Sequence, residues 1–193
     1  MRPHVLLAAP LVAVLVTALA GEAPLPEGWM FTGEDKAGCQ ATTDTVDHGP
    51  TPKAFVLHCE KSTGTQGFGT VMQMIAATDY AGKRVRLSAQ VEGQGVARWG
   101  GLWMRADTPG QKGAAFDNMA GRPLTGSFGW HEAQVVLDLP ADSRTLNFGF
   151  LLAGDGTLRA TLFKLEIVPA SVPTTGGAAQ EPLPTRAMHL SPP

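Results

Sequence analysis

The sequence has little cysteine, little tyrosine and no excess of either charge. It holds two cysteines and one tyrosine in 193 residues, and 15 Lys and Arg residues nearly balance 17 Asp and Glu residues. The charges are scattered, so the chain lacks both the basic stripe typical of nucleic-acid-binding proteins and a polybasic patch for a membrane surface. We therefore expect no nucleic-acid partner.

Catalytic motifs are also missing. No serine lies in a Gly-x-Ser-x-Gly elbow, and neither His-Glu-x-x-His nor a phosphate-binding glycine loop occurs. Ser127, His131 and Asp138 are one conceivable catalytic triad, but the residues around His131 follow the ordinary alternation of a β-strand. The acids offer no identifiable pair for glycoside hydrolysis. We expect a protein that is not an enzyme, with a hydrolase as the weakest alternative.

The longest apolar run lies at the N-terminus and is short. Arg2 and His4 precede an apolar segment that runs to Ala20 and ends in a small-residue triplet, the pattern of a signal peptide cleaved before Gly21. The alternative is a retained anchor, but a spanning helix needs about 20 apolar residues and this run also contains Pro10. We expect residues 1–20 to be a signal peptide and the protein to be periplasmic or secreted, without stable membrane insertion after cleavage.

Glycine and proline are abundant, with 23 and 15 residues, which favours many short strands joined by turns. The clearest strand is Lys83–Val91, where apolar residues alternate with Arg, Ser and Gln, as in a strand with one buried face. Similar runs are 39–43, 54–60, 69–76, 101–106, 115–118, 131–139, 146–152 and 158–168. Gly93-Gln94-Gly95 is predicted to be a turn. We expect residues 21–168 to form an all-β domain, an antiparallel β-sandwich (jelly roll) of eight to nine strands.

The two cysteines are predicted to form a disulfide. Cys39 and Cys59 lie in predicted strands, and in an oxidising compartment such a pair favours a disulfide. A catalytic thiol or a metal site with His48 and His58 is the alternative, but the spacing matches no zinc pattern.

Residues 169–193 are rich in proline, and we expect a disordered tail there rather than a proline-rich recognition segment.

From residue 67 onward the chain resembles bacterial jelly-roll domains related to galactose-binding-like and carbohydrate-binding modules. The resemblance lies in segments 67–73, 80–88, 99–105, 115–119, 137–140 and 148–154, and in the Trp130 turn. It implies two antiparallel sheets and a non-catalytic module. Many relatives end with a tryptophan and paired aspartates in the last strand, whereas this chain has Arg159-Ala160-Thr161-Leu162. That difference argues against a direct transfer of sugar binding or of a metal role.

Strand alternation predicts that Trp103 and Arg105 point to one face while Leu102 and Met104 point to the other. An aromatic ring beside polar groups suits a sugar, because its face packs on the apolar side of a pyranose and the polar groups fix the hydroxyls. We expect a ligand-binding site made of Gln73, Trp103, Arg105, Asp117 and Asn118. The alternative is that Trp103 fills the core and Arg105 pairs with Asp107 or Asp117.

The other tryptophans are expected to be structural. Trp29 and Trp130 lie near strand starts, where such rings seal a core, and Trp99 is expected to cap the sandwich rather than to bind. No cofactor is required. A structural calcium is a weak alternative, with Glu34-Asp35 and Asp44–Asp47 as ordinary loop acids that could hold it.

These patterns lead to two main hypotheses. The first is an exported module that binds a carbohydrate or another polar small ligand. The second is a protein-interaction or structural domain of the cell envelope, with an envelope protein as its partner. The sequence leaves the ligand and the oligomeric state open.

Overall fold

The computed structural model describes residues 24–34, 38–60 and 67–176, and these residues form nine strands. All the strand pairs are antiparallel. The expected all-β antiparallel sandwich is confirmed. The strands are β1 (Met30–Gly33), β2 (Cys39–Thr45), β3 (Lys53–Cys59), β4 (Phe68–Ala76), β5 (Arg84–Asp107), β6 (Ala115–Asp117), β7 (Leu124–Asp138), β8 (Thr145–Ala153) and β9 (Gly156–Ile167).

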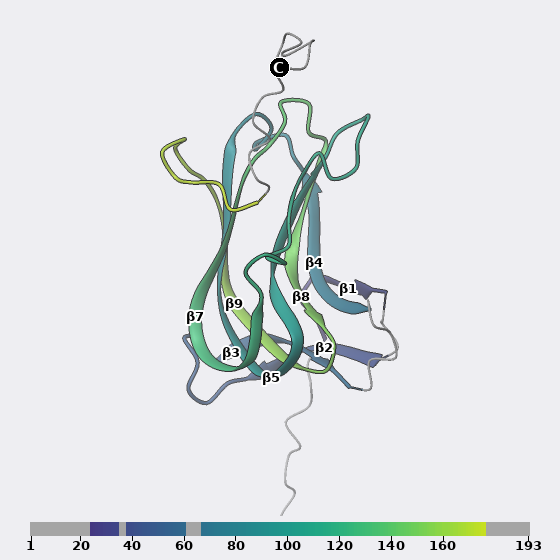
Figure 1. Ribbon diagram of the computed structural model, residues 1–193, viewed down its shortest axis with the longest axis vertical. Coiled ribbons are helices and arrows are strands. Elements are labelled where there is room, and N and C mark those ends of the chain that lie inside the picture. Colours follow the sequence, from purple (N-terminus) through teal and green to yellow (C-terminus); the bar gives the residue numbers. More distant parts are fainter. Residues whose placement is uncertain (1–23, 35–37, 61–66, 177–193) are drawn as a thin grey trace, which may run out of the picture.

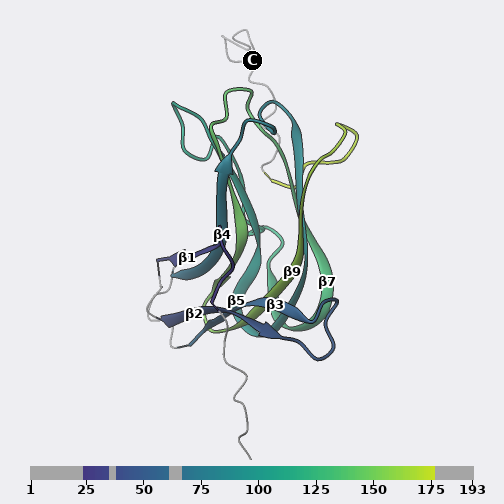
Figure 2. The same cartoon turned by 180° about the vertical axis from the view of Figure 1, so that it is seen from behind.

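The 24-residue strand β5 belongs to both layers of the sandwich. Its first part pairs with β7 and β9, and from Trp99 onward it pairs with β8 and, near its end, with β6. One layer, sheet 1, therefore runs β1-β4-β8-β5-β6, and the other, sheet 2, runs β2-β3-β9-β5-β7. Figures 1 and 2 show these two layers facing one another, with β4 and β8 in one and β3, β7 and β9 in the other.

The expected turn at Gly93–Gly95 is wrong, because these residues lie inside β5. The register with β7 shifts on both sides of Gly93, so the strand bends without leaving the sheet. Gly95 has φ +60°, and a Cβ at Gly93 would overlap the ring of Phe128. Both positions therefore need glycine, and the two strands expected at Lys83–Val91 and 101–106 are one continuous strand.

The core lies between the sheets and is filled by the inward half of each alternating strand. Leu57, Leu87, Met104 and Phe150 are among its fully buried side chains. Each such side chain stabilises the fold by about 1.5–3 kcal/mol relative to an exposed one. Trp29 belongs to this core as expected, with its ring centroid 4.5 Å from that of Phe55.

The disulfide between Cys39 and Cys59 is confirmed. The two residues are direct partners in the β2–β3 pair, with their Cα atoms 4.0 Å apart, and both are buried. Among the described residues, no group of three or more His, Cys, Asp or Glu side chains is arranged to hold a metal ion. Asp35 of the possible calcium ligands lies outside the described residues.

The chain packs against sheet 2 beyond residue 168, the boundary that the sequence predicts for the domain. Arg84 donates hydrogen bonds to the carbonyl oxygens of Ala170 and Val172 at 2.5 and 2.6 Å, and the Thr175 amide donates to Val136 at 2.9 Å. Residues 169–176 therefore pack on sheet 2. The expected signal peptide and residues 177–193 of the expected tail lie outside the described residues.

A short strand at the N-terminal side completes sheet 1. Strand β1, which alternation did not predict because it has only four residues, pairs with β4 at the edge of the sheet. Across the described part of the chain, no helix has the length and hydrophobicity needed to cross a membrane.

Replacing both cysteines by alanine should lower the free energy of unfolding by about 3 kcal/mol, because the bridge closes a loop of 20 residues and limits the unfolded chain. Urea unfolding of the wild type and of the Cys39→Ala/Cys59→Ala variant measures this difference. Wild type in the presence of a reductant is the control and should unfold like the variant. Equal stability of oxidised and reduced protein would contradict the prediction.

Candidate functional site

The outer face of sheet 1, which points away from the core, carries a hollow. Side chains on this face come from the residues that alternate with Leu102, Met104 and Phe150. In one row across the sheet, Met72, Gly149 and Trp103 are register partners on β4, β8 and β5. Gly149 lies in the middle of the row, where a Cβ would overlap the Val71 carbonyl oxygen, so no larger residue fits.

Trp103 lies on this outer face, as alternation predicted, and not in the core between the sheets. Its ring packs with Met72 and Leu151 in a separate hydrophobic cluster and is 7% exposed. The indole nitrogen donates a 2.8 Å hydrogen bond to Thr70 Oγ1, which donates in turn to the Phe150 carbonyl oxygen at 2.8 Å. These two bonds fix the ring in one orientation at the bottom of the hollow.

Arg105 stands on the same face and pairs with Asp107, one of the two partners expected for it. Its Nε and Nη2 atoms donate to the two carboxylate oxygens at 2.9 and 3.0 Å. The partial burial of Asp107 acts to raise the pKa of its carboxyl, but hydrogen bonds from Arg105, Gly113 and Thr145 and the Arg105 charge lower it below the ordinary value. Arg105 is therefore held rigidly, and its charge is largely balanced.

The hollow is a groove of about 340 Å³ that crosses the sheet from β1 to β6. Phe116, the register partner of Arg105 on β6, forms one wall and is 47% exposed. The lining is mostly apolar and aromatic, with a few hydroxyl, amide and charged groups. It comprises Thr32, Gly33, Glu34, Phe68, Thr70, Met72, Trp99, Trp103, Arg105, Phe116, Asn118 and Leu151.

Three of the five expected site residues thus lie together in the groove, namely Trp103, Arg105 and Asn118. Gln73 and Asp117 point to the other side of sheet 1, since their register partners are Phe148 and Met104 of the core. Neither lines the groove. We therefore leave Gln73 and Asp117 out of the proposed site.

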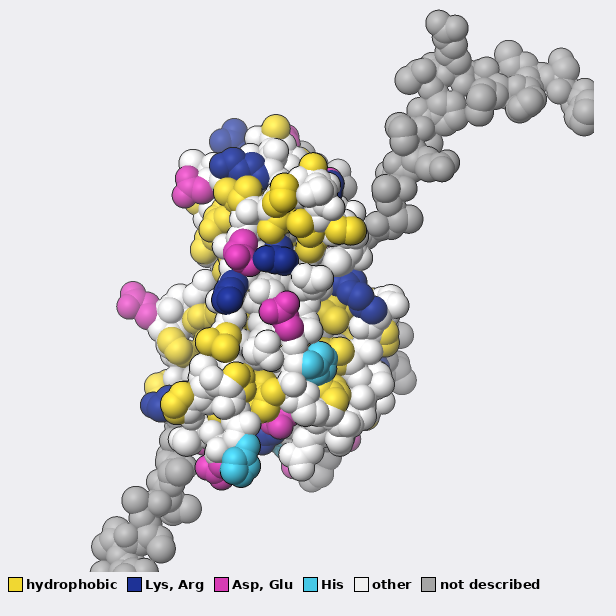
Figure 3. All heavy atoms as spheres, turned by 90° about the vertical axis from the view of Figure 1, so that its left-hand side faces the viewer, with side chains coloured by type: hydrophobic (Ala, Val, Ile, Leu, Met, Phe, Trp, Pro, Cys, Tyr) yellow, Lys and Arg dark blue, Asp and Glu magenta, His cyan; other side chains and the backbone are white. Residues whose placement is uncertain are grey.

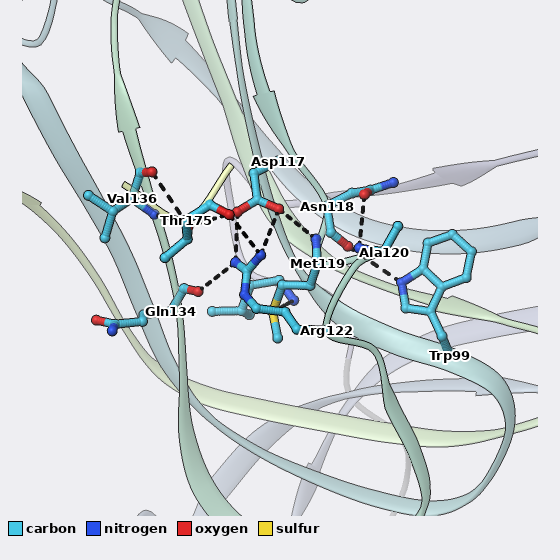
Figure 4. A network of polar contacts seen from close by, with 10 residues as sticks. Trp99, Asp117, Asn118, Met119, Ala120, Arg122, Gln134, Val136 and Thr175 are labelled. Carbon is cyan, nitrogen blue, oxygen red and sulfur yellow. Dashed lines mark hydrogen bonds and ion pairs between the residues drawn. The ribbon is translucent and has the colours of Figure 1, made fainter. Parts of the chain in front are cut away.

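Asp117 instead holds together a polar network beneath the groove (Figure 4). Its carboxylate accepts hydrogen bonds from Arg122 at 3.1 and 2.7 Å, from the Met119 amide at 2.8 Å and from Thr175 Oγ1 at 2.7 Å. Burial acts to raise the pKa of this carboxyl, but those hydrogen bonds and the Arg122 charge lower it below the ordinary value. The network joins β6 to the residues after β9.

The same network positions one wall of the groove. Asn118 follows Asp117 directly, its side-chain oxygen accepts from the Ala120 amide at 3.1 Å, and its carbonyl oxygen accepts from the Trp99 indole at 3.4 Å. Trp99, which we expected to cap the sandwich, therefore lies in the groove wall, and its indole nitrogen is hydrogen-bonded. The contacts of Asp117 and Asn118 hold the short β6 segment in place.

Sequence reasoning missed Thr70 and Phe116, the two residues that orient and flank the indole. Alternation within Ala115-Phe116-Asp117 already implies that Phe116 and Asp117 point to opposite faces. Which of them faces the groove depends on the register with β5, and a three-residue strand does not show this by itself.

The triad drawn from the sequence has no geometric support. Ser127 Oγ accepts from the Gly95 amide at 2.9 Å, His131 Nδ1 contacts the Gly129 carbonyl oxygen, and Asp138 pairs with Arg84 at 2.6 Å. Each residue is bound to a different partner.

Comparisons with known proteins support the fold. No family model matches the chain. It is 41% identical over 118 residues to the uncharacterised HTH-type transcriptional regulator YbfP of Bacillus subtilis (strain 168), a match that covers 60% of this chain and 40% of that protein. The chain thus spans less than half the length of this relative.

Among solved structures, the chain is similar to a xylan-binding domain from carbohydrate-binding module family 22, with a TM-score of 0.53 and 10% identity over 73% of this chain and 87% of that one. It is also similar to the C-terminal family 22 module of Clostridium thermocellum Xyn10B, with a TM-score of 0.51 and 9% identity over 73% and 86% of the two chains. The enzymatically active domain of bacteriophage CBA120 tailspike protein 4 has a TM-score of 0.54 and 11% identity, but the match covers 20% of that chain against 74% of this one. The resemblance to carbohydrate-binding modules is confirmed for the β-sandwich fold.

Asp117→Asn should lower the free energy of unfolding at neutral pH by about 2 kcal/mol, because it removes a charge that accepts hydrogen bonds in a buried site. The folded carboxyl has a lowered pKa, so its contribution is present above the unfolded value, near 3.8, and is lost as the pH falls through the folded value. Urea unfolding between neutral and acid pH should therefore show a weaker acid dependence in the variant. Asp142→Asn at an exposed turn is the control, and an Asp117 variant with the wild-type pH profile would contradict the assignment.

Proposed function

We propose that this protein is an exported, non-catalytic binding module that holds a carbohydrate, or another polar small ligand with an apolar face, in the groove of sheet 1. The observation that carries the proposal is the convergence of Trp103, Arg105 and Asn118 in one groove of a carbohydrate-binding-module fold. Family 22 modules named as xylan-binding share that fold. Because one fold serves many functions, the groove and not the fold supports this function.

The groove combines the two kinds of contact that a sugar ring needs. Phe116 and Trp99 offer aromatic surface for the C–H face of a pyranose, and Arg105 and Asn118 offer donors and acceptors near it. The Trp103 indole and the guanidinium are already fixed by hydrogen bonds to Thr70 and Asp107. Such a site loses little conformational entropy when a ligand binds.

Charge favours a neutral ligand. The Arg105 guanidinium is paired with Asp107 at 2.9 Å, so no unbalanced cation faces the groove to attract an anion. Glu34 at the β1 end adds an acceptor and a negative charge. We therefore expect neutral oligosaccharides to bind in preference to uronic acids.

Two features support export. The disulfide joining β2 and β3 is of the kind that persists in oxidising compartments such as the periplasm and the extracellular space. The N-terminal segment has the pattern of a signal peptide. The match to part of a longer regulator is consistent with a domain used in more than one protein.

A protein partner on the same face is the second candidate. Phe116, Met74 and Met30 are large apolar side chains on sheet 1 that are 47%, 56% and 43% exposed. Apolar groups gathered around a groove are common in protein-interaction sites. An envelope protein that docks there would use Phe116 as an anchor.

Phe116→Ala should weaken sugar binding by about tenfold, because it removes an exposed aromatic contact while the core is left intact. A glycan array covering xylo-, gluco- and galacto-oligosaccharides identifies the sugar, and titration calorimetry with the full chain measures its affinity. Trp103→Phe, which removes the bond to Thr70, should also reduce affinity.

Ile167→Ala is the matched control, because Ile167 is also an exposed apolar residue, 52% exposed, but lies outside the groove. It should bind the sugar as tightly as the wild type. Absence of binding to every sugar tested would refute the carbohydrate proposal. Capture of one stoichiometric envelope protein, lost in Phe116→Ala and kept in Ile167→Ala, would favour the second candidate.

A further inference from the structure

A second hollow lies on the outer face of sheet 2, away from the groove. Its floor is formed by Glu92 of β5 and Arg159 of β9, and its walls by Trp130 of β7 and by Asp47 and His48 after β2. It encloses about 290 Å³ and is lined mostly by polar groups. Every one of these residues belongs to sheet 2 or to its loops.

The floor is a cross-strand ion pair with free hydrogen-bonding groups. Glu92 and Arg159 are register partners, and Arg159 Nη1 donates to Glu92 Oε2 at 3.3 Å. Their side chains are 29% and 25% exposed, so both are partly desolvated. Within the described residues this is the one hydrogen bond of the Arg159 guanidinium, whose other N–H groups are free to bind a ligand.

Trp130 is not the core residue that its position near a strand start predicted. Its ring packs against neither hydrophobic cluster of the described residues, and it is partly exposed. Its indole nitrogen has no hydrogen-bond partner within the same residues, unlike those of Trp99 and Trp103, which contact Asn118 and Thr70. A tryptophan left outside both cores, with a free N–H group, is suited to hold a ligand.

The hollow continues along β5 and β7. A second depression shares Glu92 and Arg159 and adds Gln94 and Ser127. The floor therefore presents carboxylate, guanidinium and amide groups in succession beside the aromatic wall. This alternation of donors and acceptors matches adjacent hydroxyl groups on a ring.

The charges argue against an anionic ligand. Arg159 is balanced by Glu92, and the remaining acid, Asp47, opposes the binding of an anion. Figure 3 shows the side of the molecule that lies at the left of Figure 1, where acidic, basic, histidine and apolar side chains are interspersed without a large field of one charge. The chemistry fits a neutral, hydroxyl-bearing ring.

We infer that the Glu92–Arg159 pair and Trp130 form a second ligand site, which binds a neutral sugar unit on the sheet opposite to the groove. The site does not depend on the groove, because the two share no residue. A chain with both sites is bivalent and can bind two strands of a polymer, or one strand twice, with increased avidity.

The chain offers a direct test, because the indole N–H groups of its four tryptophans give separate signals in a proton–nitrogen correlation spectrum. Trp→Phe variants assign these signals. The probes are methyl β-D-xylopyranoside and methyl β-D-galactopyranoside, with glucuronate and glucosamine as charged comparators. We expect the Trp130 signal of the full chain to shift with at least one neutral glycoside, and to shift less with either charged sugar.

Arg159→Gln and Glu92→Gln should each raise the Kd measured at the Trp130 signal by about tenfold and leave the Trp103 signal unchanged. Gln134→Ala, at an exposed position further along β7, is the control and should change neither signal. Arg159→Gln keeps a hydrogen-bond donor and the pairing of β9 with its neighbouring strands. Unchanged signals of Trp29 and Trp103 would show that the variant is folded.

Three results would overturn the inference. They are a Trp130 signal that no glycoside shifts, a stronger response to a charged sugar, and a Kd at Trp130 that Arg159→Gln leaves unchanged. Failure of the groove proposal would appear separately, as a Trp103 signal that no oligosaccharide shifts while the Trp130 signal still shifts.

Discussion

The continuous pairing of β5 holds the two layers of this sandwich together. One strand of 24 residues donates and accepts backbone hydrogen bonds in sheet 2 and then in sheet 1. A strand that changes layers must bend strongly. Glycine permits the bend at two positions for different reasons, since a Cβ at Gly93 would overlap the Phe128 ring and Gly95 has φ +60°.

Alternation along the same strand gives each layer a buried and an open face. Inward residues such as Leu102 and Met104 fill the core, and Trp103 between them is directed outward. An outward tryptophan on an exposed sheet would be mobile if it were held only by packing. Thr70 fixes it, and Thr70 is itself fixed by the Phe150 carbonyl group, so the backbone of β8 determines where the indole lies.

The sequence predicted what depends on local alternation and failed where register decides. The sandwich, the disulfide and the common face of Trp103 and Arg105 follow from the period-two pattern and the cysteine positions. Gln73 and Asp117 were grouped with Trp103 because they are polar residues on nearby strands, but a one-residue change of register moves a side chain to the opposite face. Glycines at 93 and 95 predict a turn as readily as a bulge, because turns and bulges use the same residue.

Trp130 shows a different limit. A tryptophan near a strand start is commonly a core residue, and nothing in its neighbourhood along the sequence indicates otherwise. Its surroundings come from Asp47, Glu92 and Arg159, which are distant in the chain. Only the bend in β5 and the β2–β3 loop bring these residues to one place.

The attachment of Thr175 has a consequence for the groove. Thr175 hydrogen-bonds to both Val136 and Asp117, and Asp117 precedes Asn118 in the groove wall. A change at Thr175 therefore reaches the groove wall through Asp117, although Thr175 itself does not line the groove.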